Sequence, residues 1–272
     1  MPSLGNLGLR AVSALILAPL AVLAIWAGDL WFLAIMLAAC AVLAREWAQM
    51  CAPARPIPIA WAVGAALVAT TATANVALSP ALVTLVFAAA LAGVFARRIG
   101  QEGLDAAYGV LYLGWPAILL IWLRDGNSGM GLSWTILVFL VAWSADVMAF
   151  LVGSAVKGPK LWPRYSPNKT WSGFVGGLAA GSVAGWLVAA FIPGGLGVPH
   201  PLWGLLLGLA GALATMAGDL WESALKRRFG VKDAGGLIPG HGGLLDRVDG
   251  LMFAAVVLAA ARLLIIMTDG AA

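Results

Sequence analysis

The sequence predicts an all-α integral membrane protein that crosses the bilayer about nine times. Of its 272 residues 62% are hydrophobic and only 10% are charged, whereas about 25% of residues in an ordinary soluble domain are charged. Its mean hydropathy is +0.97. Many apolar runs are continuous and long enough for a helix to cross the hydrocarbon core, which takes about 20 residues. A transmembrane β-barrel is excluded because its strands would be short and would alternate in polarity.

The apolar runs are separated by short segments with turn-forming residues, such as Gly28-Asp29 and Pro193-Gly194-Gly195. The first run follows Arg10 and is longer than the apolar part of a usual signal peptide, so we expect an uncleaved first helix. The expected membrane spans are residues 10–28, 30–48, 58–76, 79–96, 107–123, 132–156, 173–192, 201–221 and 250–268.

The distribution of basic residues predicts a cytoplasmic N-terminus, because lysine and arginine collect on the cytoplasmic side of a membrane. With nine spans and the N-terminus inside, Arg124 lies outside and Arg262 lies within the last span. The other 14 of the 16 basic residues (16 minus 2) then lie on the inner side. The two polar loops, 157–172 and 222–249, both face the cytosol in this arrangement.

We expect two regions in the chain. Residues 1–130 would form a scaffold of about five spans that face lipid. Residues 131–272 would form a catalytic region of about four spans that carries both polar loops. A multi-pass location in a bacterial-type inner membrane follows, with the active site facing the cytosol.

One segment, from Asp219 to Gly250, concentrates the charge, glycine and histidine that the rest of the chain lacks. It begins at the end of the eighth span. Four polar residues there follow the spacing i, i+3, i+4 and i+7, so a continuing helix would present all of them on one face. These residues are Asp219, Glu222, Ser223 and Lys226.

The same segment continues through the glycine-rich sequence LIPGHGG to Asp246 and Asp249, which lie three residues apart on one side of a helix that becomes the ninth span. Carboxylates from two helix ends suit a hard cation such as Mg²⁺, which binds one or two carboxylates together with water and phosphate oxygens. Neighbouring lysine and arginine suit phosphate, and glycines let backbone N–H groups approach an anion. The pattern favours metal-assisted chemistry on a phosphate or diphosphate. The alternative is a solvated loop attracted to anionic lipid.

Three other places in the sequence each leave two interpretations open. His241 lies between glycines and would bind phosphate or move a proton, or else satisfy backbone groups of its loop. Asp146 lies in the middle of the sixth span, where a carboxylate is costly and should face a polar cavity or a partner; the alternative is a carboxylate paired with a basic group in helix packing. In the loop 157–172, which contains no acidic residue, we expect a turn from Ser166 to Thr170 whose Ser, Asn and Thr side-chain oxygens cap a helix or bind phosphate.

Small residues recur every four positions in the seventh and eighth spans, which lets helix backbones approach closely in lipid. The ladders serve packing within the chain or form a dimer face. They consist of Gly173, Gly177, Gly181 and Gly185, and of Gly204, Gly208 and Ala212.

The polar segment also resembles a known family. From Ser223 to Asp249 the sequence is SALKR, four residues, KD, five residues, PGHGG, LL and DRVD. This closely resembles the signature of the phosphatidate cytidylyltransferases, also called CDP-diacylglycerol synthases. The sequence SPNKTW, which begins at Ser166, and the helix containing Asp146 are similar to upstream elements of that family. The resemblance is strong over about residues 140–250.

The resemblance implies a nucleotidyltransferase that converts CTP and phosphatidate into CDP-diacylglycerol and pyrophosphate. It implies dependence on Mg²⁺, and a second or a monovalent metal is left open. The implied catalytic residues are Asp219, Lys226, Asp246 and Asp249. The implied metal ligands are Asp219, Asp246, Asp249 and Asp146. The implied substrate-binding residues are Ser166, Lys169, Thr170, Ser223, Arg227, Lys232, His241 and Arg247.

The expected partners are CTP, phosphatidate taken from the bilayer, and membrane lipids. No nucleic acid is expected, and a homodimer is left open. One rival function is an ion or solute transporter that uses Asp146 and Asp219, although the polar residues lie mainly in cytosolic loops rather than near the midplane. Another is a different lipid-phosphate transferase, such as a CDP-alcohol phosphotransferase, whose characteristic aspartate spacing is absent from the sequence.

Overall fold

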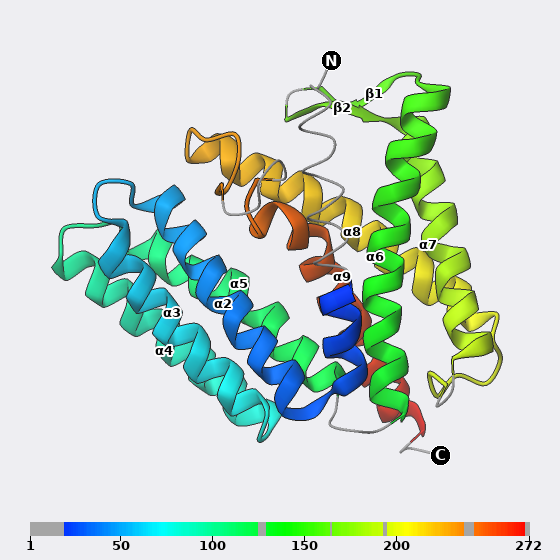
Figure 1. Ribbon diagram of the computed structural model, residues 1–272, viewed down its shortest axis with the longest axis horizontal. Helices are drawn as coiled ribbons and strands as arrows, with labels where there is room; N and C mark the ends of the chain where they lie inside the picture. Colours follow the sequence, from blue (N-terminus) through cyan, green and yellow to red (C-terminus); the bar gives the residue numbers. More distant parts are fainter. Residues whose placement is uncertain (1–18, 125–128, 164, 193–194, 237–241, 270–272) are drawn as a thin grey trace. The chain divides into compact units, whose positions relative to one another are not determined.

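The structure is a computed structural model, and it describes residues 19–124, 129–163, 165–192, 195–236 and 242–269. Within these residues eight helices are long and apolar enough to cross a membrane, which confirms the all-α polytopic class (Figure 1). Residues 19–27 are also helical, and the rest of the first expected span lies outside the described residues. The eight helices are α2 (Asp29–Cys51), α3 (Pro56–Ala74), α4 (Leu78–Arg98), α5 (Gly103–Arg124), α6 (Gly129–Val156), α7 (Trp171–Phe191), α8 (Trp203–Arg228) and α9 (Leu245–Asp269).

Two helices extend into the polar segment beyond the spans expected from hydropathy. Helix α8 continues to Arg228 rather than ending at residue 221, and α9 begins at Leu245 rather than at residue 250. Polar residues at helical spacing keep α8 regular, and Asp246 in the first turn of α9 interacts favourably with the helix N-terminus. The candidate carboxylates on these helices are therefore held by regular backbone rather than by loops.

The chain forms two compact units. The first unit combines residues 1–122 with residues 228–248, and the second combines residues 123–227 with residues 249–272. Residues 228–248, which follow α8 in sequence, thus pack with the N-terminal helices. Each unit is described below by itself.

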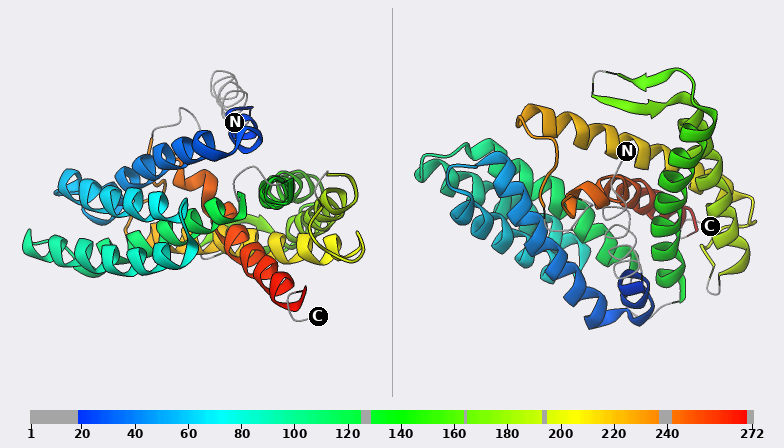
Figure 2. Two further views of the ribbon diagram at one scale, coloured as in Figure 1. Left: turned by 90° about the horizontal axis from the view of Figure 1, so that it is seen from below. Right: turned by 45° about the horizontal axis from the view of Figure 1, so that its top comes forward.

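In the first unit, α2, α3 and α4 lie side by side (Figures 1 and 2). The indole of Trp47 is completely buried, and its Nε1 donates a hydrogen bond to the carbonyl oxygen of Asp105 over 3.0 Å. The ring of Phe229 contacts Trp47 edge to face, with 5.6 Å between the ring centroids. Arg228 forms an ion pair with the Asp105 carboxylate at 2.5 Å. These contacts attach the segment that follows α8 to α2 and α5.

In the second unit, the glycines of α7 allow very close packing against α6 and α8. A Cβ atom added at Gly173 would lie 2.5 Å from the carbonyl oxygen of Ala149 in α6. At Gly185 it would lie 2.1 Å from the carbonyl oxygen of Gly204 in α8. The ladders therefore serve packing within the chain, as one of the two interpretations of the sequence predicted; a dimer stays a prediction.

The loop after α6 contains a two-stranded antiparallel hairpin, formed by β1 (Lys160–Trp162) and β2 (Ser166–Thr170). Figure 2 shows it at one end of α6 and α7. The prediction of a turn from Ser166 to Thr170 is wrong, because these residues pair with β1. The chain reverses between Trp162 and Tyr165, whose rings pack edge to face at 5.3 Å. That aromatic contact supports a reversal that comes before Ser166 rather than after it.

The predicted helix cap in this loop is confirmed. The hydroxyl oxygen of Thr170 accepts a hydrogen bond from the N–H of Gly173 over 3.2 Å, which makes Thr170 the N-cap of α7. We expect Thr170→Ala to destabilise the protein by about 1 kcal/mol, since one N–H of the first turn would lose its acceptor. Thermal unfolding in detergent should show a lower midpoint for Thr170→Ala. Thr170→Ser keeps a hydroxyl and should stay near the wild type; equal midpoints for both variants would contradict the capping role.

Candidate active site

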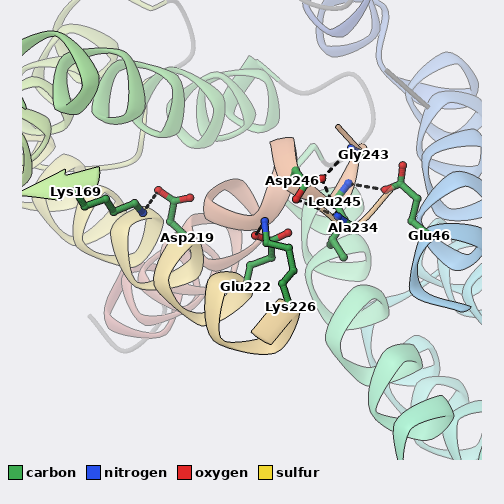
Figure 3. Close-up of polar contacts among 9 residues, drawn as sticks. All are labelled: Glu46, Lys169, Asp219, Glu222, Lys226, Ala234, Gly243, Leu245 and Asp246. Atoms are coloured by element: carbon green, nitrogen blue, oxygen red, sulfur yellow. Dashed lines mark hydrogen bonds and ion pairs between the residues drawn. The ribbon is translucent and has the colours of Figure 1, made fainter. Parts of the chain in front are cut away.

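The second unit brings together two residues that the sequence singled out, Lys169 and Asp219 (Figure 3). Strand β2 carries Lys169 and helix α8 carries Asp219. The lysine Nζ forms a hydrogen-bonded ion pair with Oδ2 of the aspartate. About a quarter to a third of each side chain is exposed, 25% for Lys169 and 31% for Asp219. The pair therefore lies where water and a polar ligand can reach it.

One turn further along α8, Glu222 and Lys226 form an ion pair of 2.5 Å at the spacing i, i+4 (Figure 3). The prediction that Asp219, Glu222 and Lys226 share one continuing helix is confirmed. Glu222 is only 2% exposed. A carboxylate buried so deeply is retained only with compensating charge or hydrogen bonds, and Lys226 supplies part of this compensation.

A third carboxylate, Asp249 of α9, lies beside Asp219 in the same unit. It is 6% exposed, and Asp219 and Glu222 are its acidic neighbours. Two glycines allow the helices to approach this closely. A Cβ at Gly218 would lie 2.5 Å from the carbonyl oxygen of Asp249, and one at Gly250 would lie 2.6 Å from Cγ2 of Thr215. The crossing of α8 and α9 thus places acidic residues from two helices together, as the sequence predicted.

In the first unit, the carboxylate of Asp246 binds backbone N–H groups (Figure 3). Its Oδ2 accepts hydrogen bonds from Ala234 over 3.0 Å and from Gly243 over 2.8 Å. Ala234 precedes the glycine-rich sequence and Gly243 is its last residue. Asp246 therefore joins the backbone before that sequence to its end, a role that sequence reasoning did not foresee for it.

The same loop is held by Glu46 of α2, which the sequence analysis missed. Its Oε1 accepts a hydrogen bond from the N–H of Leu244 and its Oε2 accepts one from Leu245, each over 2.8 Å. Glu46 is 2% exposed. A signal was present, because a single carboxylate inside an apolar run calls for a specific partner. The identity of that partner, far along the chain, was not readable from the pattern.

The structure also places the remaining predicted site residues. In the second unit Ser166 lies in β2, Thr170 is the buried N-cap described above, Ser223 and Arg227 lie on α8, and Asp146 lies on α6 with its side chain exposed. In the first unit Lys232 and Arg247 are exposed. His241 lies outside the described residues. Their roles stay predictions.

The acidic residues fit the chemistry of a divalent cation. In the parts of the chain that the structure describes, no three His, Cys, Asp or Glu side chains are arranged to hold a metal by themselves. Mg²⁺ needs only one or two carboxylates, with water and phosphate oxygens as its other ligands. The adjacent carboxylates Asp219 and Asp249 supply that number, and like charges placed so close together favour a cation.

Comparison with known proteins identifies the family of the chain. A model of the family described as "Cytidylyltransferase family" matches residues 8–265. The chain belongs to the cytidylyltransferase family. It is thus an enzyme of the nucleotidyltransferase class. The match includes the first five helices, beyond the part in which the sequence resemblance was strong.

Curated relatives agree with this assignment. The chain is 38% identical over 258 residues to a protein of Brucella abortus biovar 1 (strain 9-941) named phosphatidate cytidylyltransferase, which covers 94% of this chain and 93% of that protein. It is 38% identical over 156 residues to a protein of the same name from Staphylococcus saprophyticus, which covers 57% of this chain and 58% of that protein. A Staphylococcus aureus (strain COL) protein of that name is 38% identical over 157 residues, with the same coverage. This cytidylyltransferase is thus similar to those proteins over most of its length.

Proposed function

We propose that the protein transfers CMP from CTP to phosphatidate, with Mg²⁺, and so forms CDP-diacylglycerol and pyrophosphate for phospholipid synthesis. The observation that carries the proposal is the 38% identity, over 94% of the chain, to a protein named phosphatidate cytidylyltransferase. The adjacent carboxylates and lysines of the second unit support it, since they suit phosphate chemistry. We place the reaction at the cytosolic face of an inner membrane, on the distribution of basic residues.

The proposed reaction needs no strong general base. A phosphate monoester has a second pKa of about 6, so phosphatidate is largely dianionic at neutral pH. One of its oxygens attacks the α-phosphorus of CTP, a P–O bond forms there, and the bond from that phosphorus to the oxygen of the β-phosphate breaks. Pyrophosphate leaves with the electron pair of the broken bond. The enzyme's task is to position two anions and to neutralise their charge.

The side chains divide this task between acidic and basic groups. Asp219 and Asp249, both in the second unit, would hold Mg²⁺, which when bound neutralises phosphate charge and stabilises the leaving pyrophosphate. The roles of Asp246 and Asp146 as metal ligands stay predictions. Lys169, with Ser166 and Thr170, would bind the phosphatidate headgroup or the pyrophosphate. In the structure the Lys169 ammonium is paired with Asp219, so it would exchange this partner for substrate phosphate. Lys226, Ser223, Arg227, Lys232, His241 and Arg247 would bind the phosphates of CTP.

The proposal is tested with purified protein in detergent micelles, supplied with phosphatidate, CTP labelled at the α-phosphate, and Mg²⁺. Label should enter a chloroform-soluble lipid, and chelation of Mg²⁺ should stop its entry. CTP labelled at the γ-phosphate should leave its label in water-soluble pyrophosphate. A folded, monodisperse sample that makes no labelled lipid would refute the proposal, and solute uptake into vesicles without CTP would favour the transporter instead.

A further inference from the structure

Glu46 is a buried carboxylate whose partners all lie in one place. It comes from α2, in the region expected to be scaffold, yet it binds the N–H groups of Leu244 and Leu245 at the start of α9. Glutamate is almost never this deeply buried unless it is paired. Each carboxylate oxygen of Glu46 accepts a hydrogen bond from one of these N–H groups over 2.8 Å. Both α2 and residues 228–248 belong to the first unit, so this contact lies within one compact body.

Glu46 and Asp246 together occupy three consecutive N–H groups. Asp246 accepts the N–H of Gly243, and Glu46 accepts those of Leu244 and Leu245. The sequence analysis expected the N–H groups of this glycine-rich segment to bind an anion. In the part of the segment that the structure describes, the anions they bind are the protein's own carboxylates. These bonds fix the backbone from which Asp246 and Arg247 project.

The loop is shaped around the Glu46 side chain. A Cβ atom added at Gly243 would lie 2.8 Å from the Glu46 carboxylate, and one added at Gly235 would lie 2.9 Å from its Cγ and Oε1. Contacts under 3.0 Å force a shift of one partner. Glycine at these two positions lets the loop close on both sides of the carboxylate. At the neighbouring Gly236, an added Cβ would meet nothing within 4 Å.

We propose that Glu46 is a positioning residue for nucleotidyl transfer: by binding the N–H groups of Leu244 and Leu245, it holds the start of α9 so that Asp246 and Arg247 face CTP in the correct orientation. The inference rests on the proposed function. It extends the active site to α2, a helix that contributes no group to the reacting atoms. A residue that acts in this way should affect the use of CTP more than the use of phosphatidate.

The first experiment compares Glu46→Gln with Glu102→Gln, which removes the charge of an exposed carboxylate of the same unit. Glutamine keeps the size of Glu46 and one acceptor oxygen, but its NH₂ group would face a backbone N–H. We expect the KM for CTP of Glu46→Gln to rise about tenfold, within the range of about 10- to 100-fold known for residues that orient a ligand shell. The KM for phosphatidate should stay near that of Glu102→Gln, while the thermal midpoint should fall because one buried N–H loses its acceptor. A residue that only stabilised the fold would lower the midpoint and the active fraction and leave both KM values unchanged.

Hydrogen exchange gives a readout that is independent of activity. Amides of Leu244 and Leu245 that lose an acceptor should exchange faster. In Glu46→Gln, peptides covering 242–248 should exchange faster than in the wild type, while α3 peptides should not change. The same exchange in both proteins would overturn the inference.

The second experiment disturbs the hydrogen bonds of Glu46 by a substitution in the loop rather than in α2. Gly235→Ala pushes against Glu46 and should raise the KM for CTP, whereas Gly236→Ala should behave as the wild type. In the Glu46→Gln background, Gly235→Ala should add little, because residues that act through one contact are not additive. Fully additive effects, or equal effects of the two glycine variants, would refute the role of Glu46. If instead the wild type makes no labelled lipid, it is the proposed function that fails.

Discussion

Replacing Asp219 with asparagine is expected to reduce the transfer of CMP to lipid by about 100-fold or more, the scale on which a single group that stabilises transition-state charge acts. The carboxylate pairs with Lys169 and has Asp249 as an acidic neighbour, so it belongs to the acidic cluster of the second unit. Asparagine has nearly the same shape but no charge, and it would weaken a bound Mg²⁺. The measurement is labelled-lipid formation at increasing Mg²⁺ concentrations.

The control is Glu102→Gln, which removes an exposed carboxylate outside the family signature. Its activity and its Mg²⁺ requirement should match those of the wild type. For Asp219→Asn, extra Mg²⁺ should restore part of the activity, because the lost group would contribute to metal affinity. If both variants turn over CTP at the wild-type rate with an unchanged Mg²⁺ requirement, Asp219 is not part of the reaction site.

The sequence predicted much of the fold because hydropathy and helical periodicity are local properties. Eight described helices match the second to the ninth expected span. Helices α8 and α9 continue past the apolar spans into the polar segment, as the helical spacing of its charged residues indicated. One expectation failed, because Ser166 to Thr170 form strand β2 and the chain reverses before them, where the rings of Trp162 and Tyr165 are in contact.

The site was only partly predictable. Its acidic residues can be recognised in an apolar sequence, but their arrangement depends on contacts with residues far away in the chain. Asp219 and Asp249 stand out in an apolar chain, and a helix crossing brings them together. The contact of Glu46 with Leu244 joins residues 198 positions apart. No periodicity links these positions. Only the folded first unit shows that α2 holds the loop before α9.

A large loss of stability is expected from Gly208→Ala in α8. A Cβ atom at this position would lie 2.2 Å from the carbonyl oxygen of Gly181 and 2.9 Å from the Cα of Ser182. Both are backbone atoms of α7, so no side-chain rotation can relieve the overlap and the helices must separate. Overpacking typically costs about 1–3 kcal/mol and occasionally more. We expect a clearly lower thermal midpoint in detergent, or no monodisperse protein.

The matched control is Gly64→Ala in α3, where the added Cβ would meet only the Cβ of Ala44, at an ordinary 3.6 Å. Alanine favours a helix over glycine by about 1 kcal/mol, so this variant should be as stable as the wild type or slightly more so. A Gly208→Ala protein as stable as Gly64→Ala would refute the close packing of α7 and α8. The same packing sets the distance between Lys169, just before α7, and Asp219 on α8. Any folded Gly208→Ala protein should therefore also lose activity, because Lys169 and Asp219 would no longer be held at the spacing that the substrates need.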